Sequence, residues 1–210
     1  WDSHDVMSER IKQIRKIAQD KGVSIPIIQD LSGPRVQTGA NHHFNEGAPE
    51  ALTMKDIEDV LFGIKEGCEY VALSYVGSKD TVLALRKLIQ ENGGSALIIS
   101  KIERQQALDN LEEIVDASDA VMVARGDLGE AVPYEEVPFI QHKIVATQML
   151  LSMTESDTPT RAEVSDVAYA IVDGATAVML SEETAKGEHP QLAVAAMRRI
   201  TICAEKHLKY

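Results

Sequence analysis

Three things are scarce in this sequence of 210 residues: cysteine, basic side chains and long apolar runs. The two cysteines, Cys68 and Cys203, are far apart and outside any metal-ligand spacing, so a reduced compartment is the simplest interpretation. With 21 Lys and Arg against 33 Asp and Glu, the formal net charge is −12. No basic stripe is present to bind phosphates, so we do not expect nucleic acid as a partner. A small anionic substrate stays compatible with that charge, because a local pocket can oppose the global sign.

No apolar run approaches the roughly 20 residues that span a bilayer, and the polar start WDSHDVMSER is unlike a signal peptide. We therefore expect a cytoplasmic protein that does not bind membranes. The hydrophobic fraction of 44% provides for a sizeable core, and 210 residues suit one large domain or two small ones.

Apolar segments of two kinds alternate along the chain. Helical spacing is present in 7–21, 53–67, 78–94, 105–118, 137–144, 161–174 and 189–208. Short apolar runs typical of strands lie at 24–30, 70–76, 96–103, 119–127, 145–150 and 175–183. We expect Ser3 or Asp5 to cap the first helix, Thr53 to cap the second, and Gly67 to end the second.

Several of these strands are apolar throughout, which is typical of parallel strands covered by helices and predicts an α/β fold. Polar clusters follow the strands directly. In both a TIM barrel and a doubly wound sheet, the carboxyl ends of the strands form the site. A closed TIM barrel has eight strands, whereas only six candidates are present, so a barrel would be incomplete in this chain.

A lysine and two carboxylates stand at the ends of successive strand candidates. The two-residue period of a strand places Lys101 and Glu103 on one face, and Asp127 ends the following candidate. Adjacent parallel strands lie about 4.8 Å apart, so Glu103 and Asp127 are close enough to share one cation, and such carboxylate pairs commonly hold Mg²⁺. Lys101 then faces the same anionic substrate as a point charge. For Lys101 and Glu103 alone, a structural ion pair is an equally good interpretation.

Other polar residues near strand ends are weaker candidates. The segment GDLG at 126–129 can present backbone N–H groups to an anion, although a plain turn is the better interpretation of GDLG alone. Arg35 follows a Gly-Pro turn, Thr147 follows a strand and Lys186 lies among acids, all of which are ordinary features of turns, caps and solvated surfaces. Residues 41–43 (NHH) have no evident third metal ligand and are more simply a solvated loop.

The segments KIE, VMVARGDLG, ATQML, PTRAEVSDVA and AVMLSEETAKG, in this order, resemble the pyruvate kinase family from about Glu9 to the end of the chain. ARGDLG together with TRAEVSDVA is highly specific for that family. The resemblance implies a TIM (β/α)8-type barrel that transfers the phosphoryl group of phosphoenolpyruvate to ADP and protonates the enolate to pyruvate, with Mg²⁺ or Mn²⁺ and usually K⁺. A cytoplasmic glycolytic enzyme is implied, and we expect a homo-oligomer.

Carried over residue by residue, the resemblance implies the chemistry of the strand ends. Glu103 and Asp127 would bind the divalent cation, and Lys101 would stabilise the phosphoryl group in transit. Thr147 would belong to the protonation machinery and contact the substrate. Asp30 matches a K⁺ ligand of the family.

The substrate carboxylate would be held by backbone amides around Ala124, Gly126 and Asp127. Arg125, between them, would brace neighbouring carboxylates or partly replace a phosphate-facing arginine. Lys186 falls in a segment that lies near the nucleotide in the family.

The sequence departs from the family pattern in several places. The motif GPEIR reads GPRVQ at 33–37, so Gln37 stands at the expected arginine and Arg35 is a substitute from a neighbouring position. The phosphate-contacting arginine and two K⁺ ligands have no counterpart. Where the family inserts a lid domain, between 39 and 52, the segment is too short to fold independently. The motif SGET reads SEET at 181–184.

We interpret residues 1–210 as a single catalytic barrel domain, with no lid domain between 39 and 52 and no C-terminal regulatory domain. Two explanations of the gaps stay open. Interior segments of a longer chain are missing, which the abrupt junction KIVATQML favours, because losing half an interior strand would expose unpaired backbone groups. Alternatively, the chain is a natural or engineered short form, with a native loop in place of the lid.

The predicted function is transfer of the phosphoryl group from phosphoenolpyruvate to ADP, and two alternatives use the same barrel. One is a Mg²⁺-dependent lyase or decarboxylase of pyruvate-type substrates, which needs no ADP. The other is a non-catalytic barrel kept for subunit contacts or regulation. Retention of Lys101, Glu103, Asp127 and Thr147 counts against the non-catalytic alternative, whereas loss of the arginines counts for it.

Overall fold

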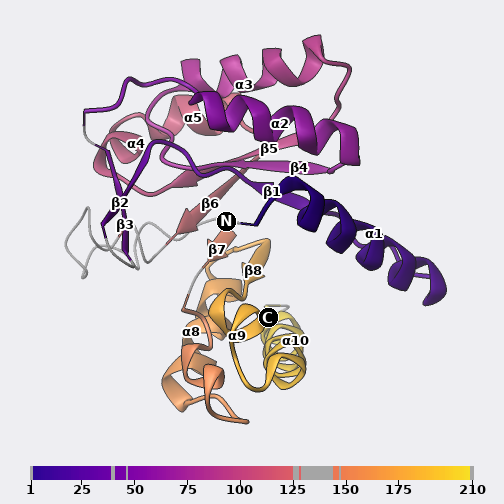
Figure 1. The fold of residues 1–210 in the computed structure, drawn as a ribbon. Helices are drawn as coiled ribbons and strands as arrows, with labels where there is room; N and C mark the ends of the chain where they lie inside the picture. The colour runs from indigo at the N-terminus through magenta and orange to yellow at the C-terminus, as the bar shows by residue number, and fades with distance from the viewer. Residues whose placement is uncertain are drawn as a thin grey trace. The chain divides into compact units, whose positions relative to one another are not determined.

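The computed structural model describes residues 2–38, 41–45, 47–124, 128, 144–146 and 148–208. They belong to two compact units (Figure 1), Trp1–Lys101 with Gln106–Ala120 and Ile102–Gln105 with Val121–Tyr210. Within the described part of the chain, none of the helices combines the length and the apolar character needed to cross a bilayer.

The described helices and strands alternate along most of the chain. In chain order they are α1 (His4–Asp20), β1 (Ile28–Asp30), β2 (Arg35–Thr38), β3 (Asn41–Phe44), α2 (Met54–Glu66), β4 (Tyr70–Leu73), α3 (Lys79–Glu91), β5 (Leu97–Ile102), α4 (Gln105–Asp109), α5 (Leu111–Ala117), β6 (Ala120–Ala124), β7 (Ile144–Ala146), the 3₁₀ helix η1 (Leu151–Thr154), α8 (Arg161–Val172), β8 (Ala177–Met179), α9 (Glu182–Ala185) and α10 (Pro190–His207).

Each of the six predicted strands is present, and each observed strand is shorter than the apolar run that predicted it. In the first unit, β1 pairs with β4 and β4 with β5, both in parallel. In the second unit, β6 pairs with β7 and β7 with β8, again in parallel. Parallel strands alternating with helices confirm the predicted α/β fold class.

Most of the predicted helices are confirmed, with two differences. The helix predicted over 105–118 is interrupted at Asn110, which separates α4 from α5. Of the helix predicted over 137–144, residues 137–143 lie outside the described residues, and Ile144 belongs to strand β7, so the prediction is wrong at that residue.

The predicted caps of α1 and α2 are confirmed. Ser3 is the N-cap of α1, and its side chain accepts a hydrogen bond from the backbone N–H of Val6. Thr53 caps α2 in a capping box with Asp56, and Gly67 ends the helix in the left-handed conformation at φ 67°. These local signals are enough to fix where α2 begins and ends.

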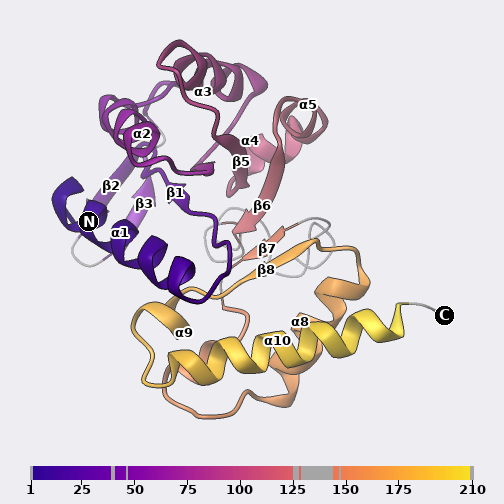
Figure 2. The same ribbon diagram turned by 90° about the vertical axis from the view of Figure 1, so that its right-hand side faces the viewer.

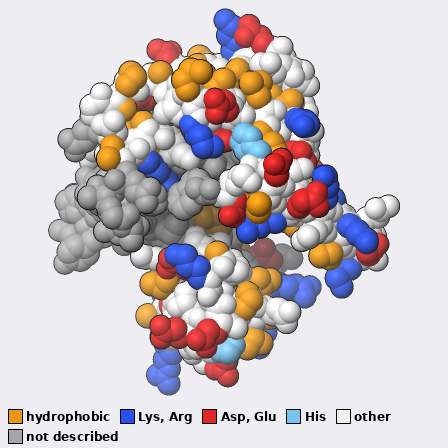
Figure 3. Space-filling model, in the orientation of Figure 1, with side chains coloured by type: hydrophobic (Ala, Val, Ile, Leu, Met, Phe, Trp, Pro, Cys, Tyr) orange, Lys and Arg blue, Asp and Glu red, His pale blue; other side chains and the backbone are white. Residues whose placement is uncertain are grey.

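The apolar stripe of α1 is only partly buried. The helical spacing over 7–21 rests on Met7, Ile11, Ile14 and Ile17. Ile11 is buried, as is Ala18, whereas Met7, Ile14 and Ile17 are 39%, 37% and 52% exposed. Basic and acidic side chains are interspersed along α1 (Figure 3), and one such pair joins Lys12 to Glu9. Helical spacing therefore identified the helix but not the extent of its buried face.

An antiparallel hairpin stands where the sequence predicted a loop in place of the lid domain. Strands β2 and β3 pair with the register Arg35↔Phe44 to Thr38↔Asn41. The segment shows no alternation of apolar and polar residues, so pattern alone gave no strand signal. Arg35 and Phe44, which are paired in this register, both pack on the ring of Tyr75, a contact distant in sequence that the local pattern does not reveal.

The core of the second unit is small and rich in methionine. In this unit α10 runs alongside α8 (Figure 2). The residues buried between these helices and the neighbouring segments are Met149, Leu150, Met153, Val167, Ala170, Ala175, Ala193, Ala196 and Met197. Four of the nine are alanines, which allow the helices to approach closely, while the flexible methionines fill the irregular space.

A glutamate joins the start of α8 to η1 in the second unit. The carboxylate of Glu163 accepts hydrogen bonds from the backbone N–H of Ser152 at 2.7 Å and of Thr160 at 2.7 Å. Burial acts to raise the pKa of Glu163, but the hydrogen bonds donated by Ser152 and Thr160 outweigh it, and the pKa lies below its ordinary value of 4.5. Ionised Glu163 therefore stabilises the folded state.

We expect Glu163→Ala to lower the free energy of unfolding at pH 7 by about 1 kcal/mol, the usual cost of losing a helix cap. Because the pKa is lowered in the folded state, this contribution is complete above pH 4.5 and is lost as the pH falls through the folded-state pKa. Urea denaturation at pH 7 and pH 3 measures the difference. The exposed Glu155, changed to alanine, is the control; an equal and pH-independent cost in both variants would contradict the assignment.

Candidate functional site

The strand register brings three polar residues to one edge of the first unit. Asp30, the last residue of β1, is level with Ala72 of β4, and Leu73 is level with Ser100 of β5. One residue further, Ser74 and Lys101 are therefore neighbours, and they lie on the same face as Asp30 because side chains alternate along a strand. The carboxyl ends of β1, β4 and β5 thus converge, as the sequence predicted.

The side chains of these three residues are joined by hydrogen bonds. Lys101 Nζ lies 3.1 and 3.3 Å from the two carboxylate oxygens of Asp30. It also donates to the hydroxyl of Ser74 at 2.9 Å, and that hydroxyl lies 3.4 Å from Asp30 Oδ1. Two of the predicted site residues, Lys101 and Asp30, are therefore in direct contact.

The lysine and the aspartate differ strongly in exposure. The Lys101 side chain is 7% exposed, whereas that of Asp30 is 60% exposed. A buried ammonium requires a compensating anion and hydrogen-bond acceptors, which Asp30 and Ser74 supply. The carboxylate is open to water, so the arrangement holds a buried ammonium close to an accessible edge of the strands.

Glu103, the predicted metal ligand that follows β5, is 2% exposed. Carboxylates at such burial are paired or coordinate a cation, so its environment suits the predicted role. Its predicted partner Asp127 lies outside the described residues. Among the residues that are described, no group of three or more His, Cys, Asp or Glu side chains is placed to hold a metal ion.

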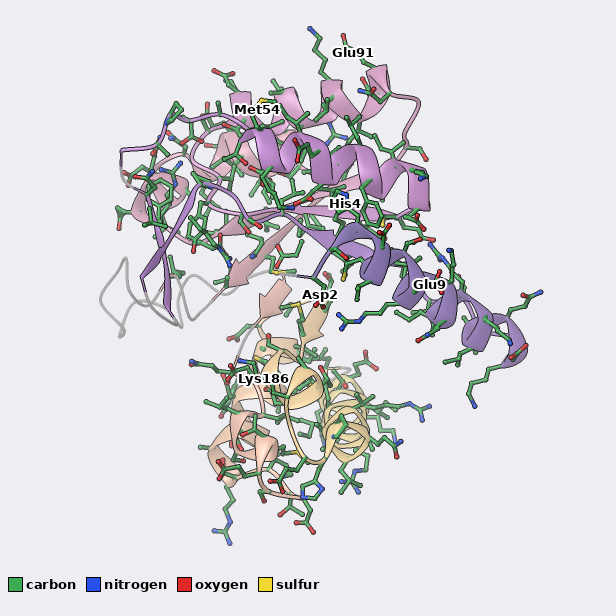
Figure 4. The ribbon with its side chains drawn as sticks, in the orientation of Figure 1. Asp2, His4, Glu9, Met54, Glu91 and Lys186 are labelled. Atoms are coloured by element: carbon green, nitrogen blue, oxygen red, sulfur yellow. The ribbon has the colours of Figure 1, made fainter. Side chains whose placement is uncertain are left out.

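The remaining predicted residues fall in three groups. Ala124 ends β6 and is buried. The side chain of Lys186 is 77% exposed on the second unit and pairs with Glu182 at 3.1 Å (Figure 4). The predictions for Arg125, Gly126, Asp127 and Thr147 fall outside the described residues, and of 41–43 only the backbone, in β3, is described.

The turn after β4 holds residues that the sequence did not single out. Tyr75 adopts a positive φ of 54°, which is rare for a residue other than glycine, and it is buried. The guanidinium carbon of Arg35 lies 5.2 Å from its ring centroid, and the ring of Phe44 lies 5.3 Å away on centroids. Arg35 is thereby held by a cation–π contact from the hairpin to the strand end.

Gly33 joins this turn to α2. Its backbone N–H donates to Asp56 Oδ1 at 3.0 Å, and Asp56 is also the capping-box residue of α2. Gly33 has φ 63°, and a Cβ there would lie 3.1 Å from the carbonyl oxygen of Ser74. The turn after β1 therefore packs directly on the backbone that presents Ser74.

A buried carboxylate organises the SEET segment of the second unit. Glu183 is fully buried, and it accepts hydrogen bonds from the backbone N–H of Leu150 at 2.9 Å and of Ser181 at 2.8 Å. A Cβ on Gly187 would lie 2.5 Å from the carbonyl oxygen of Glu183. Glu183 thus fixes the segment after β8 against the segment after β7.

A cavity of about 550 Å³ lies at the opposite end of β4 and β5 from Lys101. Its lining includes Cys68, Glu69 and Leu97, where the chain enters these strands. Burial raises the pKa of the Cys68 thiol, which keeps it protonated and unreactive. The cavity is therefore separate from the site at the strand ends.

Parallel strands that alternate with helices, with a polar cluster at their carboxyl ends, are typical of α/β proteins whose site lies at that edge of the sheet. The chain matches the family model described as pyruvate kinase, barrel domain, over residues 45–194. This chain belongs to the pyruvate kinase barrel-domain family. The predicted fold class, a TIM-type barrel that is incomplete in this chain, is confirmed by this match and by the parallel strands.

Curated relatives are similar over nearly the whole chain. A pyruvate kinase of Sporosarcina psychrophila is 44% identical over 207 residues, covering 92% of this chain and 32% of the relative. That of Mycobacterium tuberculosis is 46% identical over 200 residues, covering 90% and 39%. That of Corynebacterium glutamicum is 43% identical over 216 aligned positions, covering 97% and 42%. The chain thus spans about a third to two fifths of the length of these relatives.

We expect Gly33→Ala to destabilise the chain more than Gly22→Ala. Both glycines have φ 63°, so each variant bears a similar cost of about 1–2 kcal/mol for a Cβ at positive φ. A Cβ on Gly22 meets nothing within 4 Å, whereas one on Gly33 meets Ser74 and Tyr75, which adds roughly 1 kcal/mol. Urea denaturation of both variants measures this difference, and equal costs would contradict close packing around Ser74.

Proposed function

We propose that this chain transfers the phosphoryl group of phosphoenolpyruvate to ADP, giving pyruvate and ATP. One observation carries the proposal: the ammonium of Lys101, fixed by Asp30 and Ser74 at converging strand ends, lies within the family match. The reaction class comes from the name of the relatives, pyruvate kinase. The buried lysine supplies a positive charge that can stabilise the phosphoryl group during transfer.

Phosphoryl transfer passes through a loose transition state whose charge is spread over the equatorial oxygens. The protein's task is chiefly to position the reactants and to stabilise that charge. Lys101 suits this task because its ammonium is held nearly dry and in one place, where its field is less screened than in water. Because the Asp30 side chain is 60% exposed, a substrate can reach the strand ends from solvent next to Lys101.

The divalent cation of the proposal is Mg²⁺ or Mn²⁺, with Glu103 and Asp127 as its protein ligands. The buried carboxylate of Glu103 fits such a group. When bound, the cation would supply charge neutralisation and a template for the phosphate oxygens. A K⁺ ion at Asp30 belongs to the same proposal, because the Asp30 side chain is 60% exposed and its carboxylate keeps lone pairs beside those that face Lys101 Nζ.

Further roles belong to the same proposal. Backbone amides around Ala124, Gly126 and Asp127 would bind the substrate carboxylate, and Thr147 would take part in protonating the enolate. Lys186, on an exposed side chain, is accessible to nucleotide phosphates. Arg35 would contact phosphate, and its stacking on Tyr75 limits how far its guanidinium can move.

The broader setting is also proposed. We infer one catalytic barrel domain, a cytoplasmic location and a homo-oligomer. With a short hairpin rather than a lid domain between 39 and 52, water exclusion would be poorer and phosphoryl transfer slower. Protonation of enolpyruvate to pyruvate should suffer less.

The test is Mg²⁺-dependent formation of pyruvate from phosphoenolpyruvate, with and without ADP. We expect turnover that requires ADP and is abolished by EDTA. Lys101→Met should lower kcat at least about a hundredfold, as expected when a group that stabilises transition-state charge is removed.

Lys87→Met is the matched control, because the Lys87 side chain is 73% exposed on α3, and its kcat should stay within about twofold of the parent. Unchanged turnover in Lys101→Met would contradict the assigned role. Oxaloacetate decarboxylation without ADP-dependent turnover would support the lyase alternative instead.

A further inference from the structure

We infer that Ser74 is a positioning residue, which fixes the ammonium of Lys101 for phosphoryl transfer. In the sequence, Ser74 is distinguished solely by its place in the polar segment SYVGS (74–78), at the end of an apolar strand. The kinetic consequence rests on the proposed function, whereas the placement of the ammonium does not. Three observations carry the inference.

The first observation is the bonding of the Ser74 hydroxyl. It accepts a hydrogen bond from Lys101 Nζ at 2.9 Å, and it can donate its own proton to Asp30 Oδ1 at 3.4 Å. A hydroxyl is suited to this place because it is both a donor and an acceptor. Ser74 thus links the ammonium to the carboxylate by a second route, beside their direct contact.

The second observation is the burial of the pair. Ser74 is 3% exposed and Lys101 is 5% exposed, so water does not readily replace either partner. Asp30 differs, because its side chain is 60% exposed and water can compete for its carboxylate oxygens. Of these two acceptors, both within the described residues, the hydroxyl is the one that is shielded from water.

The third observation is how rigidly Ser74 itself is held. It directly follows β4 and precedes Tyr75, whose positive φ sets the backbone at that point. The turn at Gly33 packs against its carbonyl oxygen, since a Cβ there would lie only 3.1 Å away. Gly33 is in turn bonded to the buried Asp56 at 3.0 Å. The strand end and the helix α2 therefore both determine where the hydroxyl lies.

The consequence for the reaction is specific. A lysine side chain has four rotatable bonds, so without a fixed acceptor its ammonium would sample several positions. Ser74→Ala should therefore reduce the stabilisation of the transition state more than the binding of the substrate. The expected result is a fall in kcat of about tenfold with KM for phosphoenolpyruvate within about twofold.

The closing experiment measures the ammonium directly. In the full chain labelled with ¹⁵N-lysine, the Nζ resonance of Lys101 is assigned by its loss in Lys101→Met, and the exchange of its protons with water is measured by NMR. Ser74→Ala should speed this exchange by at least about tenfold, the effect of losing one hydrogen bond to a charged group. Ser74→Thr, which keeps the hydroxyl, should restore both the exchange rate and kcat.

Two further variants keep the test decisive. Ser74→Cys is nearly the same size with a weak acceptor, so it replaces Ser74→Ala if that variant fails to fold. Ser100→Ala is the matched control, because Ser100 is fully buried beside Lys101 in sequence and its hydroxyl is bonded to Ser118 at 2.7 Å instead.

Exchange that is unchanged in Ser74→Ala, or accelerated equally in Ser100→Ala, would overturn the inference. The exchange measurement needs no turnover, so it stands even if the parent chain makes no pyruvate. If the parent chain makes no pyruvate but exchange is faster in Ser74→Ala, the proposed function fails and the positioning role of Ser74 is supported.

Discussion

The ion pair between Lys101 and Asp30 is the interaction on which the first unit's site depends. It joins the ends of β5 and β1 across the intervening strand β4, which contributes Ser74 to the same cluster. A nearly buried ammonium is stable only where acceptors surround it. The parallel register of the three strands places Asp30 and Ser74 beside Lys101 and so allows its charged side chain to be buried. The same charge is what a phosphoryl-transfer site needs. The contact between Lys101 and Asp30 therefore serves both the packing of the three strand ends and the proposed phosphoryl transfer.

Carboxylates perform a comparable task in the second unit, where they bind backbone rather than ammonium. Glu183 holds the N–H groups of Leu150 and Ser181, and Glu163 holds those of Ser152 and Thr160. These four amides belong to segments that follow strands or begin helices, where backbone donors lack partners within the element. The hydrogen bonds join the segments after β7 and β8 to each other and to the start of α8, beside the methionine-containing core cluster.

Local signals in the sequence predicted the elements better than the contacts between them. Thr53 and Gly67 identified the ends of α2, and the apolar runs identified all six parallel strands. Lys101 was found because it stands at the end of an apolar strand on the same face as Glu103, and the resemblance to the family, now confirmed, singled out Asp30. Ser74 and Tyr75 were missed because their partners are distant in sequence, and the β2–β3 hairpin was missed because its segment shows no alternation of apolar and polar residues. Asp30 was predicted as a K⁺ ligand, but its contact with Lys101 follows only from the strand register.

The central claim is that Asp30 and Lys101 stabilise each other, and a double-mutant cycle on the free energy of unfolding tests it most directly. Asp30→Asn removes a carboxylate partner from a nearly buried ammonium, whereas Lys101→Met leaves a carboxylate that water can solvate. The account predicts that Asp30→Asn costs more than Lys101→Met, and that the two changes couple by at least about 1 kcal/mol. Additive costs, with no coupling between the two positions, would contradict it.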